Sequence, residues 1–317
     1  MEESARPPRL RIGVSSCLLG HPVRYDGGHK RHRSVTGTLS RLFEIVAVCP
    51  EMEVGMGVPR EPVDLVGEPR APRMVGQDSG KDWTAVMGRF GQRRAAEVEK
   101  LEVSGFVLKR GSPSCGPDRV PVHSGSGKTH PSGSGLFARA LADSLPLLPV
   151  ETEDQLDDAL LCENFIERVH AYRDWRACAR EAPSLARLMD FHASHKLTLL
   201  AHGERHLRLL GRLLAEAGPG PPETVTTRYG SAFMEALKQP PTRKTNTNAL
   251  QHLAGFLSDR LDPESRKQLA AIVDDYRLGR APLSAPLALV RRHALEHEVD
   301  YVLGQSFLRR HETGTPG

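Results

Sequence analysis

Three cysteines lie in polar stretches rich in glycine, proline and serine, each at or shortly after the end of an apolar run. Cys17 follows LRIGVSS, Cys49 follows EIVAV, and Cys115 follows GFVLK across the loop RGSPS. None has a second cysteine near it in sequence, which excludes a CxxC redox pair and a zinc ribbon. If the three thiols meet, they suit an open zinc site or an iron–sulfur cluster with one labile iron. Cys162 and Cys178, on predicted helices, fit the role of small buried hydrophobes.

Two polar side chains adjoin these cysteines and extend the possible chemistry. Glu51 comes two residues after Cys49, and Ser112 comes three residues before Cys115. A carboxylate beside a metal centre acts as a general base on water. A hydroxyl at such a site relays a proton or holds a substrate oxygen. Glu51 and Ser112 are therefore candidates for catalytic roles, although each is a weak signal by itself.

The stretch VRYDGG supplies side chains that stack on a planar base and hydrogen-bond to it, namely Arg24, Tyr25 and Asp26. Lys109, the last residue of the apolar run before Cys115, completes the predicted substrate-binding set. Each of these side chains, taken singly, is also typical of a solvated surface. Their proximity in sequence to the cysteines is what marks them as candidates.

The elements that position these residues follow the pattern of an α/β domain, in which short β-like runs alternate with helical segments. The runs and segments cover 10–16, 36–43, 44–48, 80–103, 105–109, 136–143 and 145–151. A Pro/Gly-rich stretch at 55–76 and a Gly/Ser-rich loop at 124–135 carry no strand prediction. Parallel strands end at one edge of a sheet, where ligands bind. We therefore expect a mostly parallel sheet with the three cysteines converging at that edge.

The second half changes character near Val150 and predicts an all-α domain. Its apolar residues recur at helical spacing, with neither β-like alternation nor an internal repeat. Helical runs are predicted at 223–238, 246–260, 263–277 and 286–297, separated by the stretches QPPTRK, DPES and GRAPLSAP. The predicted organisation is a disordered tail at 1–9, an α/β domain at 10–150 and a helical domain at 151–317.

Composition favours a cytoplasmic protein. The N-terminus MEESARPPRLR lacks the apolar segment of a signal peptide, no 18-residue apolar run is present, and five scattered cysteines do not suggest a disulfide framework. The formal net charge is +4, and the pI is about 8.9. Residues 1–150 carry 21 Lys+Arg against 16 Asp+Glu, and residues 151–317 carry 22 against 23. This charge permits an acidic partner such as RNA without requiring one.

A basic stretch in the helical half, LKQPPTRKTNTNALQH at 237–252, is the strongest candidate for contact with RNA. It surrounds a predicted helix N-terminus at Thr245–Asn246, whose free N–H groups suit a phosphate. The predicted RNA-contacting residues are Lys196, Lys238, Arg243, Lys244, Arg291 and Arg292. The alternative for this stretch is a capped, solvated loop.

Four histidines follow helical spacing in the same half: His192, His195, His202 and His206. One helix face carrying four imidazoles would suit a metal ion, although Gly203 is expected to break the helix. Core packing and polar contacts are commoner uses of such histidines. No metal is assigned to them.

At VSSCLLGHPVRYDGG, VCPE and SPSCG the sequence resembles the thiouracil desulfidase (TudS) family, over about residues 10–150. From about residue 151, the stretches ENFIERVHAYRDW, FHASHKLTLLAH, TRKTNTNALQHLAGF and APLSAPLALVRRH resemble the helical domain often fused to it. Together the halves resemble the RudS-type fusion proteins, which remove sulfur from 4-thiouridine in tRNA.

The resemblance implies that Cys17, Cys49 and Cys115 hold a [4Fe-4S] cluster by three of its irons. It assigns Glu51 and Ser112 as the acid–base and substrate-positioning pair. The implied reaction is a non-redox hydrolysis in which water replaces a thiocarbonyl sulfur and hydrogen sulfide leaves. The implied partner is tRNA containing 4-thiouridine. Independently of the resemblance, no membrane contact is expected, and a monomer is favoured although the sequence does not determine the oligomeric state.

The stretch CPEMEVGMGVPR departs mildly from the family pattern, because Glu53 lies close enough to Glu51 to compete for the role of base. Three other functions stay open at this stage. They are desulfuration of free thiouracil or thiouridine nucleotides, persulfide transfer by Cys115 or Cys17, and zinc-stabilised RNA binding.

Overall fold

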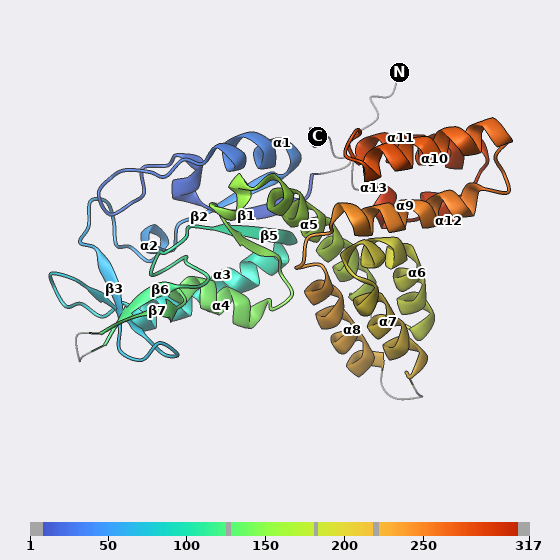
Figure 1. Ribbon diagram of the computed structural model, residues 1–317. Helices are drawn as coiled ribbons and strands as arrows, with labels where there is room; N and C mark the ends of the chain where they lie inside the picture. Colours follow the sequence, from blue (N-terminus) through green and yellow to red (C-terminus); the bar gives the residue numbers. More distant parts are fainter. Residues whose placement is uncertain (1–8, 125–127, 181–182, 218–221, 310–317) are drawn as a thin grey trace, which may run out of the picture. The chain divides into compact units, whose positions relative to one another are not determined.

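The computed structural model describes the chain from residue 9 to residue 309, apart from 125–127, 181–182 and 218–221. The chain divides into two compact units at Tyr172–Arg173, within one long helix. Figure 1 shows the ribbon, with an α/β first unit and a second unit of helices.

The first unit contains a four-stranded parallel sheet, a second smaller sheet, and helices. Its elements, in chain order, are β1 (Arg11–Ser15), η1 (Ser16–Leu19), η2 (Val35–Leu39), α1 (Ser40–Leu42), β2 (Glu44–Val48), α2 (Pro50–Glu53), β3 (Val63–Val66), β4 (Arg73–Gly76), α3 (Thr84–Lys100), β5 (Val103–Leu108), β6 (Val120–His123), β7 (Thr129–Gly133), α4 (Leu136–Ser144), β8 (Val150–Thr152), η3 (Gln155–Asp157) and the first part of α5 (Ala159–Ala179).

The parallel sheet has the strand order β2-β1-β5-β8, with every neighbouring pair parallel. Strand β5, with the sequence VSGFVL, is buried at all six positions, as expected of a strand covered on both faces. Gly13 of β1 lies under the ring of Phe106, where an added Cβ would be 2.1 Å from a ring carbon. The predicted α/β fold with a mostly parallel sheet is confirmed.

One face of this sheet packs against the start of α5. Ile12, Val14 and Val107 from β1 and β5 form a core with Phe165 and Val169 of α5. Since these helix residues bury their side chains in the first unit, the unit extends well beyond the last strand. This accounts for the division within α5, whereas the predicted boundary at 150–151 would cut through β8.

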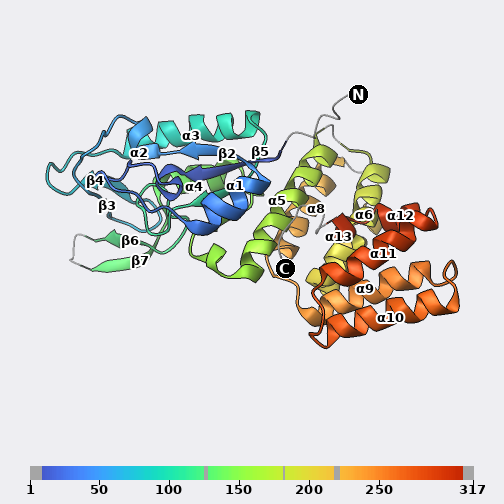
Figure 2. The ribbon, with the colours of Figure 1, turned by 90° about the horizontal axis from the view of Figure 1, so that it is seen from above.

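The other face of the sheet is covered by α3 and α4, which Figure 1 shows on the opposite side of the sheet from α1; Figure 2 shows the same ribbon from above. Phe106 of β5 lies edge-on to Phe137 of α4, with ring centroids 5.8 Å apart. Phe137 in turn contacts Phe90 of α3 at 5.9 Å. This three-layer arrangement leaves the carboxyl ends of the parallel strands open for a site.

The second sheet, of order β4-β3-β6-β7, corrects the sequence-based prediction, because it occupies parts of the stretches 55–76 and 124–135. Its strands have only four or five residues and lie among glycines and prolines. Short runs of this kind give little periodic signal. Residues 125–127 of the Gly/Ser-rich loop lie outside the described residues, as do residues 1–8 of the predicted tail.

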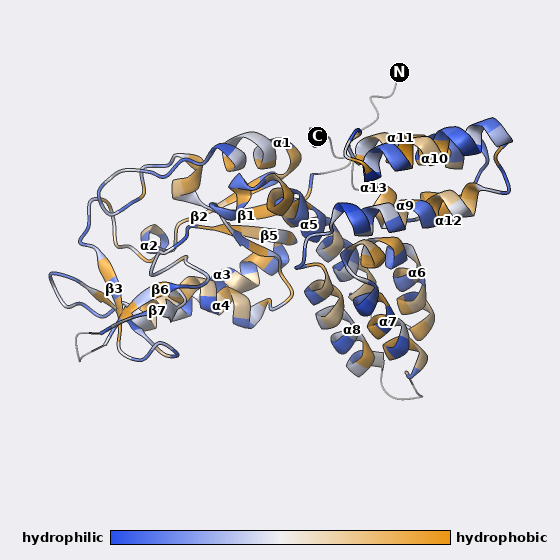
Figure 3. Ribbon diagram, viewed as in Figure 1, coloured by the Kyte–Doolittle hydropathy of each residue, from blue (hydrophilic) through white to orange (hydrophobic). Residues whose placement is uncertain are grey.

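The second unit is helical, which confirms the all-α prediction for this half. Its elements are the end of α5, α6 (Leu185–His202), α7 (Glu204–Ala215), α8 (Pro222–Ala236), α9 (Arg243–Leu257), α10 (Pro263–Arg277), α11 (Ser284–Glu296), α12 (Asp300–Leu303) and α13 (Ser306–Arg309). Figure 3 shows that these helices carry both hydrophobic and hydrophilic residues. Their buried leucines, valines and alanines form a core among α6, α9, α10 and α11.

Helix ends in this unit follow from local capping. The Asp262 carboxylate accepts the backbone N–H groups of Glu264 and Ser265, each at 2.9 Å, which starts α10 at its predicted position. Helix α6 ends at His202 because Gly203 adopts a positive φ of 145°. Among the described residues, no helix is long and apolar enough to cross a membrane.

Helix α9 begins at Arg243, earlier than the predicted N-terminus at Thr245–Asn246. The Thr242 hydroxyl accepts the N–H of Thr245, and the Thr245 hydroxyl accepts the N–H of Thr242. This reciprocal pair is a capping box, and it moves the start of the helix to Arg243. One of the N–H groups expected to be free for a phosphate is therefore used within the chain.

Candidate active site

The three cysteines of the first unit line one pocket of about 350 Å³. Cys17 lies in η1 directly after β1, Cys49 separates β2 from α2, and Cys115 lies in the loop after β5. Strands β2, β1 and β5 are neighbours in the parallel sheet, so their carboxyl ends bring these loops together (Figure 1). A volume of this size is typical of a small-molecule site.

Most of the predicted site residues line the same pocket. Those brought together are Cys17, Cys49, Cys115, Glu51, Ser112, Arg24, Tyr25 and Lys109. Asp26 does not line it. Its carboxylate is exposed, accepts the N–H of Gly28 at 2.9 Å and pairs with Arg24 at 3.5 Å. In this structure Asp26 therefore shapes the turn that carries Arg24.

The start of α4 holds the loop that carries Cys115. The N–H groups of Leu136 and Phe137, which have no partner within the helix, donate to the carbonyls of Pro113 and Ser114, each at 3.0 Å. The Ser112 hydroxyl oxygen accepts the N–H groups of Ser114 and Cys115, at 3.2 and 3.1 Å. Because these two bonds use the oxygen only as an acceptor, the Ser112 hydroxyl proton can be donated into the pocket.

Backbone hydrogen bonds fix the other two cysteines. The Cys17 carbonyl accepts the N–H groups of Gly20 and Lys30, at 3.3 and 2.9 Å. The Cys49 N–H donates to Glu53 Oε1 at 3.0 Å, and the Glu53 N–H donates back to the Cys49 carbonyl at 3.0 Å. Glu53 thus holds the backbone at Cys49.

Burial is the main influence on the three thiols. It raises the pKa of Cys17 to about 11, with a smaller contribution from Cys49. Burial also raises the pKa of Cys49, and raises the pKa of Cys115 well above its ordinary value. Without a bound cation the three groups are therefore neutral thiols at pH 7. A cationic centre in the pocket would favour their thiolate forms.

Glu51 is held by two side chains in the pocket wall. Ser114 donates its hydroxyl proton to Glu51 Oε1 at 2.6 Å, and Arg60 donates through Nε to Oε2 at 3.1 Å and through a second nitrogen to the same oxygen. Glu53 instead faces Cys49 N and Arg94 Nε, the latter at 3.7 Å. Of the two competing carboxylates, the one that lines the pocket is Glu51.

Three of the four predicted substrate-binding residues, Arg24, Tyr25 and Lys109, line the pocket. The Arg24 guanidinium lies 5.3 Å from the centre of the Tyr25 ring, which is 41% exposed. The Lys109 ammonium pairs with Glu153 and donates to the Arg110 carbonyl at 2.8 Å. An exposed ring beside a guanidinium provides a stacking surface for a planar ligand.

The site fits a [4Fe-4S] cluster held by three thiolates. Cys17, Cys49 and Cys115 line the same pocket, and thiolates are the usual ligands of iron–sulfur clusters. The pocket volume of about 350 Å³ leaves space for a group larger than a single ion.

The predicted RNA-contacting residues lie on several elements of the second unit. Lys238 pairs with Glu235 at 2.7 Å, and Arg292 pairs with Glu296 at 3.5 Å. Arg243 donates to the Tyr276 carbonyl at 2.6 Å and stacks over the Tyr276 ring. Arg243 therefore has a packing role whatever else it does. Lys196 and Lys244 are exposed on α6 and α9, and Arg291 is half-buried on α11.

The predicted histidine stripe is divided between two helices. His192 Nδ1 lies 3.0 Å from the Tyr229 hydroxyl, and His202 Nδ1 lies 2.7 Å from the Gln239 carbonyl. His195 is buried with its ring centre 4.1 Å from that of Phe191. His206 belongs to α7, beyond the break at Gly203. These contacts are the packing and polar roles expected of such histidines.

Sequence reasoning missed three residues of the pocket region. Arg60 contacts Glu51, and its side chain is 6% exposed. Ser114 is fully buried beneath Glu51, and the Ser15 hydroxyl bonds to Cys115 and accepts the Lys109 N–H at 3.0 Å. Ser114 and Ser15 each lie within two residues of a cysteine, which was the available signal. Arg60 had none, since it lies within the irregular Pro/Gly-rich stretch at 55–76.

The fold and the pocket define a class: an α/β domain with a thiol-lined, ligand-sized pocket at the edge of a parallel sheet. The family model described as 2-thiouracil desulfurase matches residues 12–153. A second model, a protein family of unknown function (DUF1722), matches residues 196–312. The chain belongs to the 2-thiouracil desulfurase family through its first region, as the sequence motifs indicated.

Two curated proteins and one solved structure are similar to parts of this chain. The uncharacterized protein YbbK of Bacillus subtilis (strain 168) is 31% identical over 154 residues, which are 47% of this chain and 99% of that protein. The uncharacterized protein YbgA of Escherichia coli (strain K12) is 28% identical over 141 residues, 44% of this chain and 83% of that protein. Among solved structures, the [4Fe-4S]-dependent thiouracil desulfidase TudS is 32% identical, covers 49% of this chain and 97% of its own, and has a TM-score of 0.39.

Proposed function

We propose that this protein is a [4Fe-4S]-dependent desulfidase that converts 4-thiouridine in tRNA to uridine and releases hydrogen sulfide. The observation that carries the proposal is the shared pocket, in which three cysteines from three neighbouring strand ends lie with Glu51 and Ser112. Family membership and the cluster dependence of the solved relative support the same chemistry. Net electron transfer is not needed, since water replaces sulfur at unchanged oxidation state.

Cys17, Cys49 and Cys115 would hold the cluster by three of its irons. When bound, such a cluster supplies an iron with an open position, a Lewis acid that suits a soft thiocarbonyl sulfur. The same thiols are protonated at neutral pH when they are buried without a cation. Loading of the site therefore releases protons.

Glu51 acts as the general base in this proposal. Arg60 and Ser114 hold its carboxylate at two points, so it has one orientation toward the pocket. Oε1 accepts the Ser114 hydroxyl and keeps a further acceptor position for water, whereas both positions of Oε2 are used by Arg60. A water deprotonated there would add to C4 of the base, and loss of sulfur would restore the carbonyl.

The remaining pocket residues position the substrate. Ser112 offers its hydroxyl proton to an oxygen of the base, while Tyr25 and Arg24 offer a stacking surface. The Lys109 ammonium, which pairs with Glu153, places a positive charge in the pocket. That charge would stabilise a bound phosphate or an enolate oxygen through a charge-assisted hydrogen bond. We assign the tRNA contact to the helical second unit. A base in folded RNA must be located and unstacked before it can react, and contacts from a second unit to the RNA would help to do this.

A substrate panel tests the proposal. Anaerobically reconstituted protein is given tRNA containing 4-thiouridine, the free nucleoside and nucleotide, and free thiouracil, and sulfide and desulfurated base are measured. We expect sulfide release from tRNA with higher kcat/KM than from the free compounds. Turnover restricted to free thiouracil or to nucleotides would leave a desulfidase but remove tRNA as its substrate.

The same preparation separates the desulfidase from the two other functions. A brown protein with broad absorption near 400 nm and stoichiometric iron is expected. A colourless, iron-free protein that carries persulfide on Cys115 or Cys17 would support sulfur transfer instead. A colourless protein that binds zinc and tRNA without releasing sulfide would support an RNA-binding role.

A further inference from the structure

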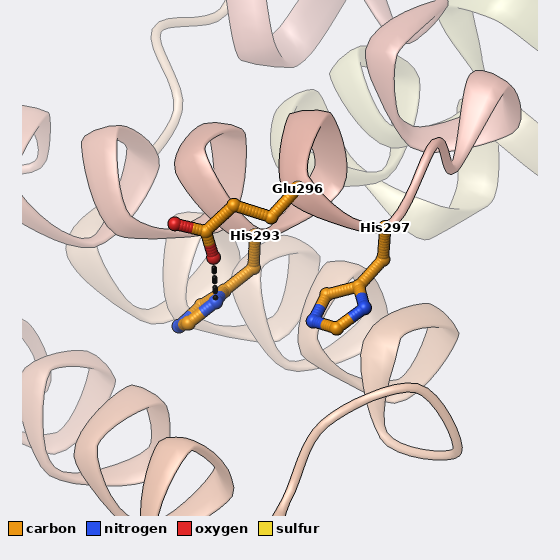
Figure 4. Close-up of side chains that lie close together, drawn as sticks. All are labelled: His293, Glu296 and His297. Atoms are coloured by element: carbon orange, nitrogen blue, oxygen red, sulfur yellow. Dashed lines mark hydrogen bonds and ion pairs between the residues drawn. The ribbon is translucent and has the colours of Figure 1, made fainter.

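We propose a second metal site in the helical unit, formed by His293, Glu296 and His297 at the carboxyl end of α11. One ligand atom from each side chain lies within 4.8 Å of the others. Figure 4 shows the three side chains next to one another, with a hydrogen bond between Glu296 and His293. None of these residues belongs to the cysteine pocket.

The donor set defines the metal. Two imidazole nitrogens and one carboxylate oxygen are ligands that Zn²⁺ accepts, with water completing the tetrahedron. The sequence HALEH places them at i, i+3 and i+4, positions that share one face of a helix. Hard cations such as Mg²⁺ and Ca²⁺ prefer oxygen ligands, so they are disfavoured.

The site is partly organised without metal. His293 is only 3% exposed, so its ring has little freedom, and its Nδ1 lies 3.0 Å from Glu296 Oε2. Metal binding at Nδ1 replaces the proton shared between these two atoms. The last turn of α11 also favours a cation, because the aligned peptide dipoles of a helix place partial negative charge at its C-terminus.

Two features limit the affinity of this site for Zn²⁺. Arg292 lies 3.5 Å from Glu296 and competes for its carboxylate. The Nε2 atom of His293 is buried with no hydrogen-bond partner among the described residues. Metal-bound histidines usually donate their second N–H to an oxygen, and losing such a bond costs 10–100-fold in affinity. The site therefore binds Zn²⁺ more weakly than a structural zinc site does.

Zinc titration of the full-length protein with its cluster loaded tests the site, because the pocket cysteines are then occupied. Zinc bound per chain is counted by equilibrium dialysis and elemental analysis. We expect His297→Ala to bind one zinc ion fewer than the wild type, and Glu296→Gln to bind that ion at least about tenfold more weakly. The matched control is His252→Ala, which removes an exposed histidine of α9 and should match the wild type.

Co²⁺ titration gives an independent readout of the ligands. The band lost in His297→Ala should lack the strong near-ultraviolet absorption of thiolate–cobalt bonds, because this site has nitrogen and oxygen donors. Circular dichroism checks that each variant is folded. Equal zinc counts and affinities in the wild type and in His297→Ala, or a wild type that binds no zinc outside the cysteines, would overturn the proposal.

Discussion

Glu51 is the carboxylate on which the proposed hydrolysis depends, and its replacement by glutamine separates chemistry from cluster binding. Glu51→Gln keeps the shape of the side chain and removes the base. We expect a normal cluster spectrum with a fall of about 10²–10⁴ in turnover, the usual contribution of a general base. Sulfide release under single-turnover conditions, measured beside iron content and absorption, checks this expectation.

Glu53→Gln is the matched control for that variant. Its amide oxygen can still accept the Cys49 N–H, and the side chain does not line the pocket. Turnover within a few-fold of the wild type is therefore expected. If Glu53→Gln loses turnover and Glu51→Gln keeps it, the two carboxylates have the opposite roles.

Arg60 is predicted to act through Glu51, as a positioning residue. Its guanidinium makes two contacts to one oxygen of Glu51 and also donates to the carbonyls of Gly57 and Val23, at 2.7 and 3.0 Å. Arg60→Lys keeps the charge but cannot reproduce this fork. We expect a loss of about 10²-fold in kcat with little change in cluster content. An unchanged kcat would show that Ser114 alone is sufficient to orient Glu51.

The loop from Ser112 to Gly116 is fixed to the start of α4, because N–H groups of the helix donate to carbonyls of the loop. Gly135, the residue before α4, lies against this loop. A Cβ added at Gly135 would be 2.5 Å from the Ser114 carbonyl carbon and 2.9 Å from the Cys115 nitrogen. Backbone atoms cannot move away as the end of a flexible side chain can, so the loop itself would shift.

Gly135→Ala is therefore expected to reduce iron incorporation and to lower the free energy of unfolding by about 1–3 kcal/mol, as overpacking does. Iron per chain and thermal unfolding measure the two effects. The control is Gly88→Ala in α3, where an added Cβ meets nothing within 4 Å. That variant should gain about 0.5–1 kcal/mol and keep full iron content. Full iron content in both variants would contradict the role assigned to Gly135.

Binding of tRNA is the prediction that concerns the protein as a whole, because a desulfidase for a free base needs no helical unit. Arg243 is a poor probe of RNA contact, since it also holds Tyr276. Lys238 and Lys244 are better probes. Both are exposed, and the Lys238–Glu235 pair contributes little to stability at the surface.

Lys238→Ala/Lys244→Ala should weaken tRNA binding and leave the cluster spectrum and turnover of free thiouracil, if any, unchanged. The logarithm of the binding constant falls linearly with the logarithm of the salt concentration, and each phosphate contact contributes about 0.7–0.9 to the steepness of that slope. Loss of two contacts should therefore make the slope shallower by this amount for each contact. Affinities measured at several salt concentrations test this. Lys267→Ala, an exposed lysine of α10, controls for a general change in charge. Wild-type affinity and slope in the double variant would direct the search for the RNA contact to the first unit, where the +5 net charge of residues 1–150 lies.

Local patterns in the sequence were sufficient to predict the parallel sheet, the helical half and the strand-end positions of the three cysteines. Strand β2 and helix α10 begin and end at the predicted residues. These features depend on alternation, helical spacing and caps such as Asp262, all of which act between residues a few positions apart. The family motifs around the cysteines are local in the same sense.

Contacts between distant residues required the fold. Ser114 and Glu51 are 63 residues apart in the chain, and their hydrogen bond forms only because the carboxyl ends of β2 and β5 share a sheet edge. The separate orientations of Glu51 and Glu53 follow from Arg60 and Arg94, neither of which sequence spacing marked. Periodicity reports which side of an element is buried, but it does not specify which side chain from elsewhere will meet it there. The second sheet and the residues that hold Glu51 in place were therefore decided by packing.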